Sequence, residues 1–205
     1  MEGATELRVI PYLMEANGVE WELECTPVVH IAPNNGVDQL LERGVIESEL
    51  SASGLEALGV VVDANGDAGR RWNQIRDRCR NEFDVLPNEI PEGGLNVDHR
   101  DGPRFGVWIM PDNRFEGMLE DFLLRLVPDQ HGALYDLARN CVAEAARKGA
   151  SFKGAHVRKA EIHTWLAWQD EPGPQLHEAV KHRVLDPTKP ESHAFVDWFR
   201  TLFSV

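Results

Sequence analysis

The chain has 205 residues, of which 42% are hydrophobic and 27% are charged. This composition is typical of a globular protein with a substantial core, and it excludes wholesale disorder and collagen-like repeats. The 21 Lys and Arg stand against 34 Asp and Glu, so the formal net charge is −13. This charge argues against non-specific coating of nucleic acid, which depends on Lys and Arg. It leaves room for an enzyme that meets phosphate through bound metal ions, because these supply positive charge.

The cysteines and the N-terminus indicate the compartment. Cys25, Cys79 and Cys141 are odd in number and far apart, which favours neither a disulfide framework nor a zinc–thiolate site. No apolar run approaches the roughly 20 residues of a membrane span, and no basic region opens the chain as in a secretory signal. We therefore expect a cytoplasmic protein with no membrane partner.

The first half of the chain alternates helical and strand patterns. A helix is predicted over 6–16, because apolar residues recur on one face and Asn17-Gly18 provides a C-terminal stop. The strongest strand pattern is the continuous apolar run 58–63, which is typical of a strand covered on both faces. The other predicted elements are a strand at 28–31 and helices at 36–43, 47–57 and 70–83.

The second half begins in the same way and then becomes helical. A buried strand is predicted at 105–110 and a helix at 116–127, and the alternation implies a parallel sheet with helices on its faces. Beyond Pro128 the predicted helices are 130–148, 155–169 and 191–203. We therefore expect an α/β fold with a core over 1–128 and a helical C-terminal extension over 129–205 that packs on this core.

The motif DANGD begins at the last residue of the strongest strand and places Asp63, Asn65 and Asp67 at alternate positions. A loop at the carboxyl end of a parallel strand can direct several oxygens at one point, and such hard ligands suit Mg²⁺ or Mn²⁺. An EF-hand is excluded, because Ala68 stands where that loop needs Gly and Gln74 where it needs Glu. Capping of the next helix remains an alternative for these residues.

Other common site motifs are absent. The sequence has no glycine-rich dinucleotide or P-loop motif and no nucleophile elbow. His177 and His182 are five residues apart and do not share a helix face, which argues against a histidine zinc site.

Several segments together resemble the Toprim domains of OLD-type nucleases. The opening Glu2-Gly3-Ala4-Thr5-Glu6 resembles their E-G-x-[ST]-[DE] signature, and LGVVVDAN over 58–65 resembles their D-x-D strand. The segments 106–113, 117–121 and 159–167 resemble an uncharacterised prokaryotic branch of Toprim-like proteins. In the family a strand precedes the first acid, whereas here Met1 directly precedes Glu2.

The resemblance implies a parallel α/β unit that binds divalent metal and acts on phosphodiester bonds. Glu2 and Lys159 match catalytic positions, and the lysine is placed to stabilise transition-state charge. The metal ligands that we expect are Glu6, Asp63, Asn65, Asp67 and Glu120. Asn65 stands where the family has the second acid of D-x-D, and Asp67 is the candidate to replace it.

The leading hypothesis is therefore a Mg²⁺- or Mn²⁺-dependent phosphoryl-transfer enzyme, a nuclease whose binding to nucleic acid requires metal. The first alternative is a non-catalytic Toprim-like module that binds nucleic acid, a nucleotide or a protein. The second is a generic acidic α/β protein in which the acids of DANGD only cap a helix. For single residues, the alternatives place Glu120 and Lys159 on solvated faces and Glu6 in the first turn of a helix. The sequence leaves open whether the chain forms a homo-oligomer.

Overall fold

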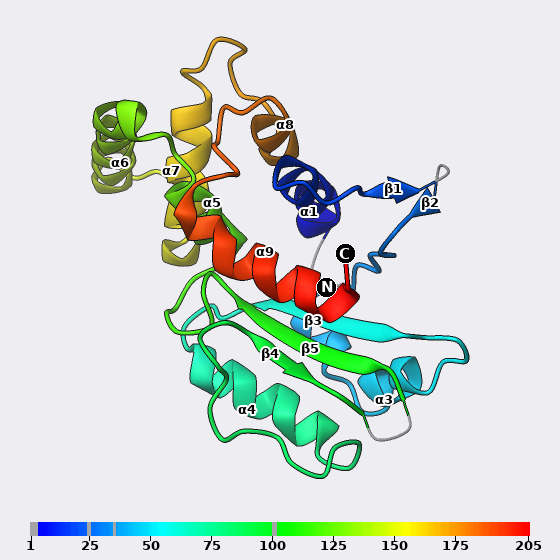
Figure 1. Cartoon of the computed structure of the whole chain (residues 1–205). Helices are drawn as coiled ribbons and strands as arrows, with labels where there is room; N and C mark the ends of the chain where they lie inside the picture. The colour runs from blue at the N-terminus through cyan, green and yellow to red at the C-terminus, as the bar shows by residue number, and fades with distance from the viewer. Residues whose placement is uncertain (1–3, 24–25, 35, 100–101) are drawn as a thin grey trace.

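The computed structural model describes residues 4–23, 26–34, 36–99 and 102–205. These residues form an α/β fold around a three-stranded sheet with the strand order β3-β5-β4 (Figure 1). The central strand β5 runs parallel to β3 and antiparallel to β4, so the sheet is mixed. The strands are β3 (Ala57–Asp63), β4 (Leu95–Val97) and β5 (Arg104–Met110).

The two long strands confirm the buried strands predicted at 58–63 and 105–110. The two long strands pair in parallel as expected, and β4, which was not predicted, adds to the free edge of β5 in the opposite direction. β4 has three residues, of which Leu95 is buried, and so short a strand has no detectable alternating pattern.

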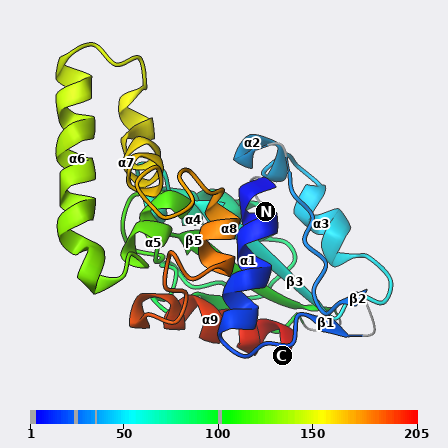
Figure 2. The same ribbon diagram turned by 90° about the horizontal axis from the view of Figure 1, so that it is seen from above.

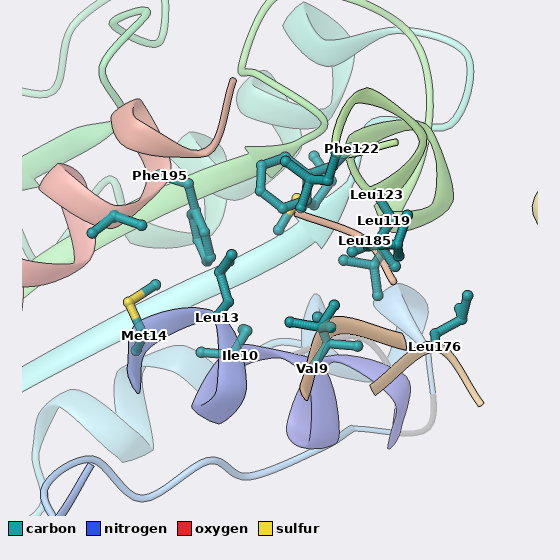
Figure 3. Packing of buried hydrophobic residues seen from close by; sticks show 14 of the residues in the cluster. Val9, Ile10, Leu13, Met14, Leu119, Phe122, Leu123, Leu176, Leu185 and Phe195 are labelled. Carbon is teal, nitrogen blue, oxygen red and sulfur yellow. The ribbon is translucent and has the colours of Figure 1, made fainter. Parts of the chain in front are cut away.

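Helices cover both faces of the sheet, as the continuous apolar run of β3 predicts. Because side chains alternate along a strand, Val60 and Val62 join one buried cluster and Val61 joins the other. The Val60 face packs against α2 (Val37–Leu40), α3 (Val45–Leu50) and α4 (Ala68–Cys79). The opposite face packs against α1 (Ala4–Ala16) and α9 (Pro190–Phe203), as Figures 1 and 3 show.

The C-terminal helix α9 is part of the sheet's core. The indole Nε1 of Trp198 donates a 2.9 Å hydrogen bond to the carbonyl oxygen of Leu95 in β4. The ring of Trp108 in β5 lies 5.8 Å from that of Trp198 and 5.2 Å from that of Phe195, measured between centroids. Gly106 allows this close approach, because a Cβ there would come within 2.5 Å of Leu202.

The remaining helices extend from the carboxyl end of β5. In Figure 2, α6 lies beside α7 and projects away from the sheet, whereas α8 lies beside α1. The elements are α5 (Leu119–Arg125), η1 (Asp129–His131), α6 (Gly132–Arg147), η2 (Gly154–His156), α7 (Val157–Leu166) and α8 (Leu176–Lys181). None of the helices in the described part of the chain is long and apolar enough to cross a membrane.

The segment between α1 and β3 differs most from its prediction. The strand expected at 28–31 is wrong: these residues are irregular and follow a short antiparallel pair, β1 (Glu22–Leu23) and β2 (Thr26–Pro27). The helices expected at 36–43 and 47–57 are present in shorter form as α2 and α3, which end at Leu40 and Leu50. Gly44, with a φ of 89°, is the N-cap of α3 and separates it from α2.

Candidate active site

The loops that follow β3 and β5 are bonded to each other at the carboxyl edge of the sheet. The backbones of Asn65 and Gly117 exchange two hydrogen bonds of 2.8 Å. Asn65 has a φ of 53° and Gly117 a φ of 141°, conformations that Asn and Gly adopt with little strain. A Cβ on Gly117 would also lie 2.8 Å from an oxygen of Asp121. The motif DANGD is therefore joined to the loop that begins α5.

Asp63 lies at this junction. Its Oδ1 accepts a 2.9 Å hydrogen bond from the backbone N–H of Leu119, the first residue of α5. Its backbone oxygen accepts a 3.0 Å bond from Nε of Arg71, a buried residue of α4. The end of β3 is thus tied to the beginning of both α5 and α4, next to Glu120.

Glu120 and Lys159, which are far apart in the sequence, form an ion pair. Lys159 Nζ lies 3.1 Å from Oε1 of Glu120, and the side chains are 52% and 7% exposed, respectively. A buried carboxylate requires a partner charge, and the ammonium group of Lys159 provides it for Glu120. The interpretation of Glu120 as part of a solvated face is wrong, since it points into the α5–α7 interface.

A second group of ion pairs and hydrogen bonds is centred on Arg158, the residue before Lys159. Arg158 lies 3.1 Å from Asp121 and 2.8 Å from the buried carboxylate of Glu161, which also accepts a 3.1 Å bond from the Tyr135 hydroxyl. Burial and then the adjacent Glu161 raise the pKa of Tyr135 to about 12. The hydrogen bond to Glu161 raises the pKa of Arg158. These contacts join α5, α6 and α7 around Lys159.

Asp121 and His163 also titrate differently from free side chains. Burial raises the pKa of Asp121, although a hydrogen bond from the Met118 N–H and the charge of Arg158 oppose the shift. Burial, followed by the charge of Lys159, lowers the pKa of His163, and Glu120 acts in the opposite direction. His163 thus lies in the field of both members of the Glu120–Lys159 pair.

The other predicted ligands have local structural roles. Asp67 is the N-cap of α4, and its Oδ1 accepts a 2.9 Å bond from the Arg70 N–H, which confirms the capping alternative. Asn65 contributes its backbone to the bridge with Gly117. Neither contact tests a role for these side chains in metal binding.

The N-terminal signature contributes two predicted site residues, Glu2 and Glu6. Glu2 lies outside the described residues, and Glu6 belongs to α1 without a described side chain. In Figure 3 the Val9 end of α1 lies toward Leu119 of α5, and Met14 lies at the far end. The beginning of α1 therefore approaches the sheet edge that carries Asp63.

The described residues do not by themselves complete a metal site. Over 4–23, 26–34, 36–99 and 102–205, no group of three or more His, Cys, Asp or Glu side chains is arranged to hold a metal ion. Of the predicted ligands, Asp63 and Glu120 lie at the carboxyl edge of the sheet. Glu2 and Glu6 are further acids predicted for this site.

Sequence reasoning missed the groups that support this region. Arg71, Arg158 and Tyr135 have no motif or spacing that marks them, because their partners come from other elements. The loop after β5 is held in the same way: Asp112 pairs with Arg125 at 2.7 Å. For this pair the sequence offers one signal, which is an acid at the beginning of a loop followed by an Arg on the next helix.

Comparison with known proteins places the chain in a family without an assigned activity. A family model described as "Protein of unknown function (DUF3226)" matches residues 1–204. No match was found among curated proteins or among solved structures.

Proposed function

We propose that this chain, which belongs to the DUF3226 family, is a divalent-metal-dependent enzyme of Toprim-like type that hydrolyses phosphodiester bonds in nucleic acid. One observation carries the proposal. Asp63, Glu120 and Lys159 come from three segments matched by the Toprim resemblance, and the contacts Asp63–Leu119 and Glu120–Lys159 gather them at the beginning of α5. Carboxyl edges of parallel strands are where α/β proteins usually bind their ligands.

The chemistry of these groups suits the proposed reaction. Asp63 and Glu120, together with Glu2 or Glu6, would hold Mg²⁺ or Mn²⁺ through oxygen ligands. When bound, the metal would supply Lewis-acid stabilisation of the phosphoryl oxygens. Lys159 is half exposed, so its ammonium group can face a phosphate while Glu120 fixes its position. The acids of this region would repel phosphate, so substrate binding should be weak without metal.

Nuclease assays with matched variants test the proposal. Single-stranded DNA, duplex DNA and RNA are incubated with Mg²⁺, Mn²⁺ or a chelator, and cleavage is compared for Asp63→Asn, Glu120→Gln and Lys159→Met. We expect a loss of about 100-fold or more for each variant, a size typical of removing one charge-stabilising group. The amide oxygen that Asp63→Asn introduces can still accept the hydrogen bond from the Leu119 N–H, so the fold should persist.

Asp77→Asn is the control, because Asp77 is an exposed acid of α4 whose side chain pairs with Arg80. It should cleave at the wild-type rate. Equal cleavage by the wild type and the Asp63 and Glu120 variants would mean that the active-site assignment is wrong.

A non-catalytic module is the second candidate, and two contacts favour it. Lys159 already neutralises Glu120, and Asp67 already caps α4. Thermal unfolding during a metal titration separates the candidates: a competent site raises Tm with Mn²⁺ in the wild type but not in Asp63→Asn. No shift at millimolar metal, together with no cleavage, would favour the module.

A further inference from the structure

Arg158 and Lys159 are neighbours in α7, and each pairs with one of two neighbouring acids of α5. Lys159 Nζ lies 3.1 Å from Oε1 of Glu120, and Arg158 Nε lies 3.1 Å from Oδ1 of Asp121. Consecutive residues of an α-helix point about 100° apart, because one turn holds 3.6 residues. The two ion pairs therefore hold α7 to α5 in two different directions.

The guanidinium group of Arg158 also contacts a buried acid of its own helix. Its Nη1 lies 2.8 Å from Oε2 of Glu161, whose side chain is 7% exposed. The same oxygen accepts the hydrogen bond from the hydroxyl of Tyr135 in α6. A planar guanidinium group that is held at two of its nitrogens has a fixed orientation. Arg158 is thus a rigid connection between α7 and the Asp121 carboxylate of α5.

Lys159 by itself is a weaker connection. Its ammonium group is carried on a flexible four-carbon chain, and its side chain is 52% exposed. Ion pairs with an exposed member contribute little to holding two helices together, because solvent screens the attraction and the long side chain loses entropy. The position of Lys159 on Glu120 therefore depends on how firmly other contacts fix α7 against α5.

Asp121 links Arg158 to the beginning of α5. Its Oδ2 accepts a 2.9 Å hydrogen bond from the Met118 N–H, while its Oδ1 faces Arg158. The N–H of the next residue, Leu119, donates to Oδ1 of Asp63. The contact between Arg158 and Asp121 is therefore connected to the backbone group that binds Asp63 as well as to the helix that carries Glu120.

We propose that Arg158 is a positioning residue of the candidate active site, which keeps the ammonium group of Lys159 on Glu120 by fixing α7 against α5. It acts through these two residues. Its catalytic meaning rests on the proposed phosphodiesterase activity, whereas the contact between Lys159 and Glu120 can be measured without any activity.

Amine labelling measures this contact. The full chain is treated briefly with sulfo-N-hydroxysuccinimide acetate at constant pH, and mass spectrometry gives the acetylation rate of Lys159 relative to Lys148, which is 74% exposed at the end of α6. A paired ammonium group must leave its carboxylate before it reacts. We therefore expect Arg158→Met to raise the relative rate about threefold, within the range that an ion pair of this exposure is worth. Glu120→Gln sets the upper limit.

Asp121→Asn breaks the same contact from the side of α5. It leaves the buried Glu161 paired with Arg158, and its amide oxygen can still accept the hydrogen bond from the Met118 N–H, so the fold should persist. We expect the relative labelling rate of Lys159 to rise in this variant as well.

Ile162→Val is the control for a general loss of stability. Ile162 is a fully buried residue of α7, so the variant removes part of a core side chain and leaves the ion pairs in place. It should lower Tm without changing the relative labelling rate of Lys159. Thermal unfolding of every variant supplies the Tm for this comparison.

Cleavage kinetics connect the position of Lys159 to catalysis. With a nucleic acid that the wild type cleaves, Arg158→Met and Asp121→Asn should lower kcat roughly tenfold or more and change KM little, because misplacement of a transition-state group is expected to act on the chemical step. If the wild type cleaves no substrate, the proposed activity fails, and labelling still decides the role of Arg158.

Three results would overturn the proposal. The first is unchanged labelling of Lys159 in both Arg158→Met and Asp121→Asn. The second is an equal rise in Ile162→Val at the same loss of Tm, which would make Arg158 a stabilising residue only. The third is wild-type kcat in a variant whose Lys159 labelling has risen.

Discussion

At the scale of single residues, the charges around α5 are paired more completely than the sequence suggests. Lys159 pairs with Glu120, and Arg158 pairs with both Asp121 and Glu161. Removing one partner of a buried pair leaves the other charge uncompensated, so substitutions here affect stability as well as any activity. Variants that keep shape and remove charge are therefore the informative ones.

The loop that precedes α5 gives a pH-dependent prediction through Asp112. Burial opposes ionisation of this carboxyl, but hydrogen bonds from the Phe115 N–H, the Arg125 side chain and the Arg114 N–H together lower its pKa. A lowered folded-state pKa means that the stabilisation is fully present above the unfolded value of about 3.9 and is lost as the pH falls through the folded value. Asp112→Asn removes this contribution.

We expect Asp112→Asn to lower the free energy of unfolding by about 1 kcal/mol at pH 7, and the difference to shrink below about pH 4. Urea unfolding of wild type and variant between pH 3 and pH 7 measures it. A difference that stays constant over this range would contradict the role assigned to the ionised carboxylate.

At the scale of elements, the beginning of α4 decides between two interpretations of the DANGD motif. The side chain of Asp67 satisfies the N–H of Arg70, which has no acceptor within the helix. This contact explains the acid without any ligand. A metal role for Asp67 stays a prediction, and the two roles respond differently to substitution.

We expect Asp67→Ala to lower the free energy of unfolding by about 1 kcal/mol, whereas Asp67→Asn keeps a cap and costs little. Urea unfolding measures both. If Asp67 also binds metal, Asp67→Asn loses part of the Tm increase that Mn²⁺ produces in the wild type. An Asp67→Ala variant as stable as the wild type would contradict the capping role.

At the scale of the whole molecule, segments from both ends of the sequence complete one core. Residues of α1 and α9 share a buried cluster with Trp108 of β5 and Phe122 of α5. The Arg200 side chain of α9 donates to the backbone oxygen of Asn17, just beyond α1. The predicted division into a core at 1–128 and an extension at 129–205 stays a prediction, and truncation tests it.

A fragment of residues 1–128 keeps α1 but lacks α9, so the part of the sheet that α9 covers, including Trp108, would be exposed to water. Because a contiguous exposed apolar patch promotes aggregation, we expect the fragment to be insoluble or to lack a cooperative unfolding transition. Circular dichroism with urea titration, beside the full chain, measures this. A fragment that unfolds cooperatively would instead show that the first 128 residues are an independent domain.

The sequence by itself determined the α/β class, both long strands and most of the helices. These depend on local apolar patterns, such as the run before Asp63 and the amphipathic face of α9. It also indicated that Asp63 ends a strand and offered a cap of the next helix as one of two roles for Asp67, because strand ends and caps are local features.

Only the tertiary structure decided which distant groups meet. The pairing of Glu120 with Lys159 and the antiparallel direction of β4 both depend on contacts between segments that are separated in the chain. A periodic pattern identifies the face that a residue buries, but it does not identify the partner. For that physical reason, the sequence named candidate residues, and packing selected those that lie together.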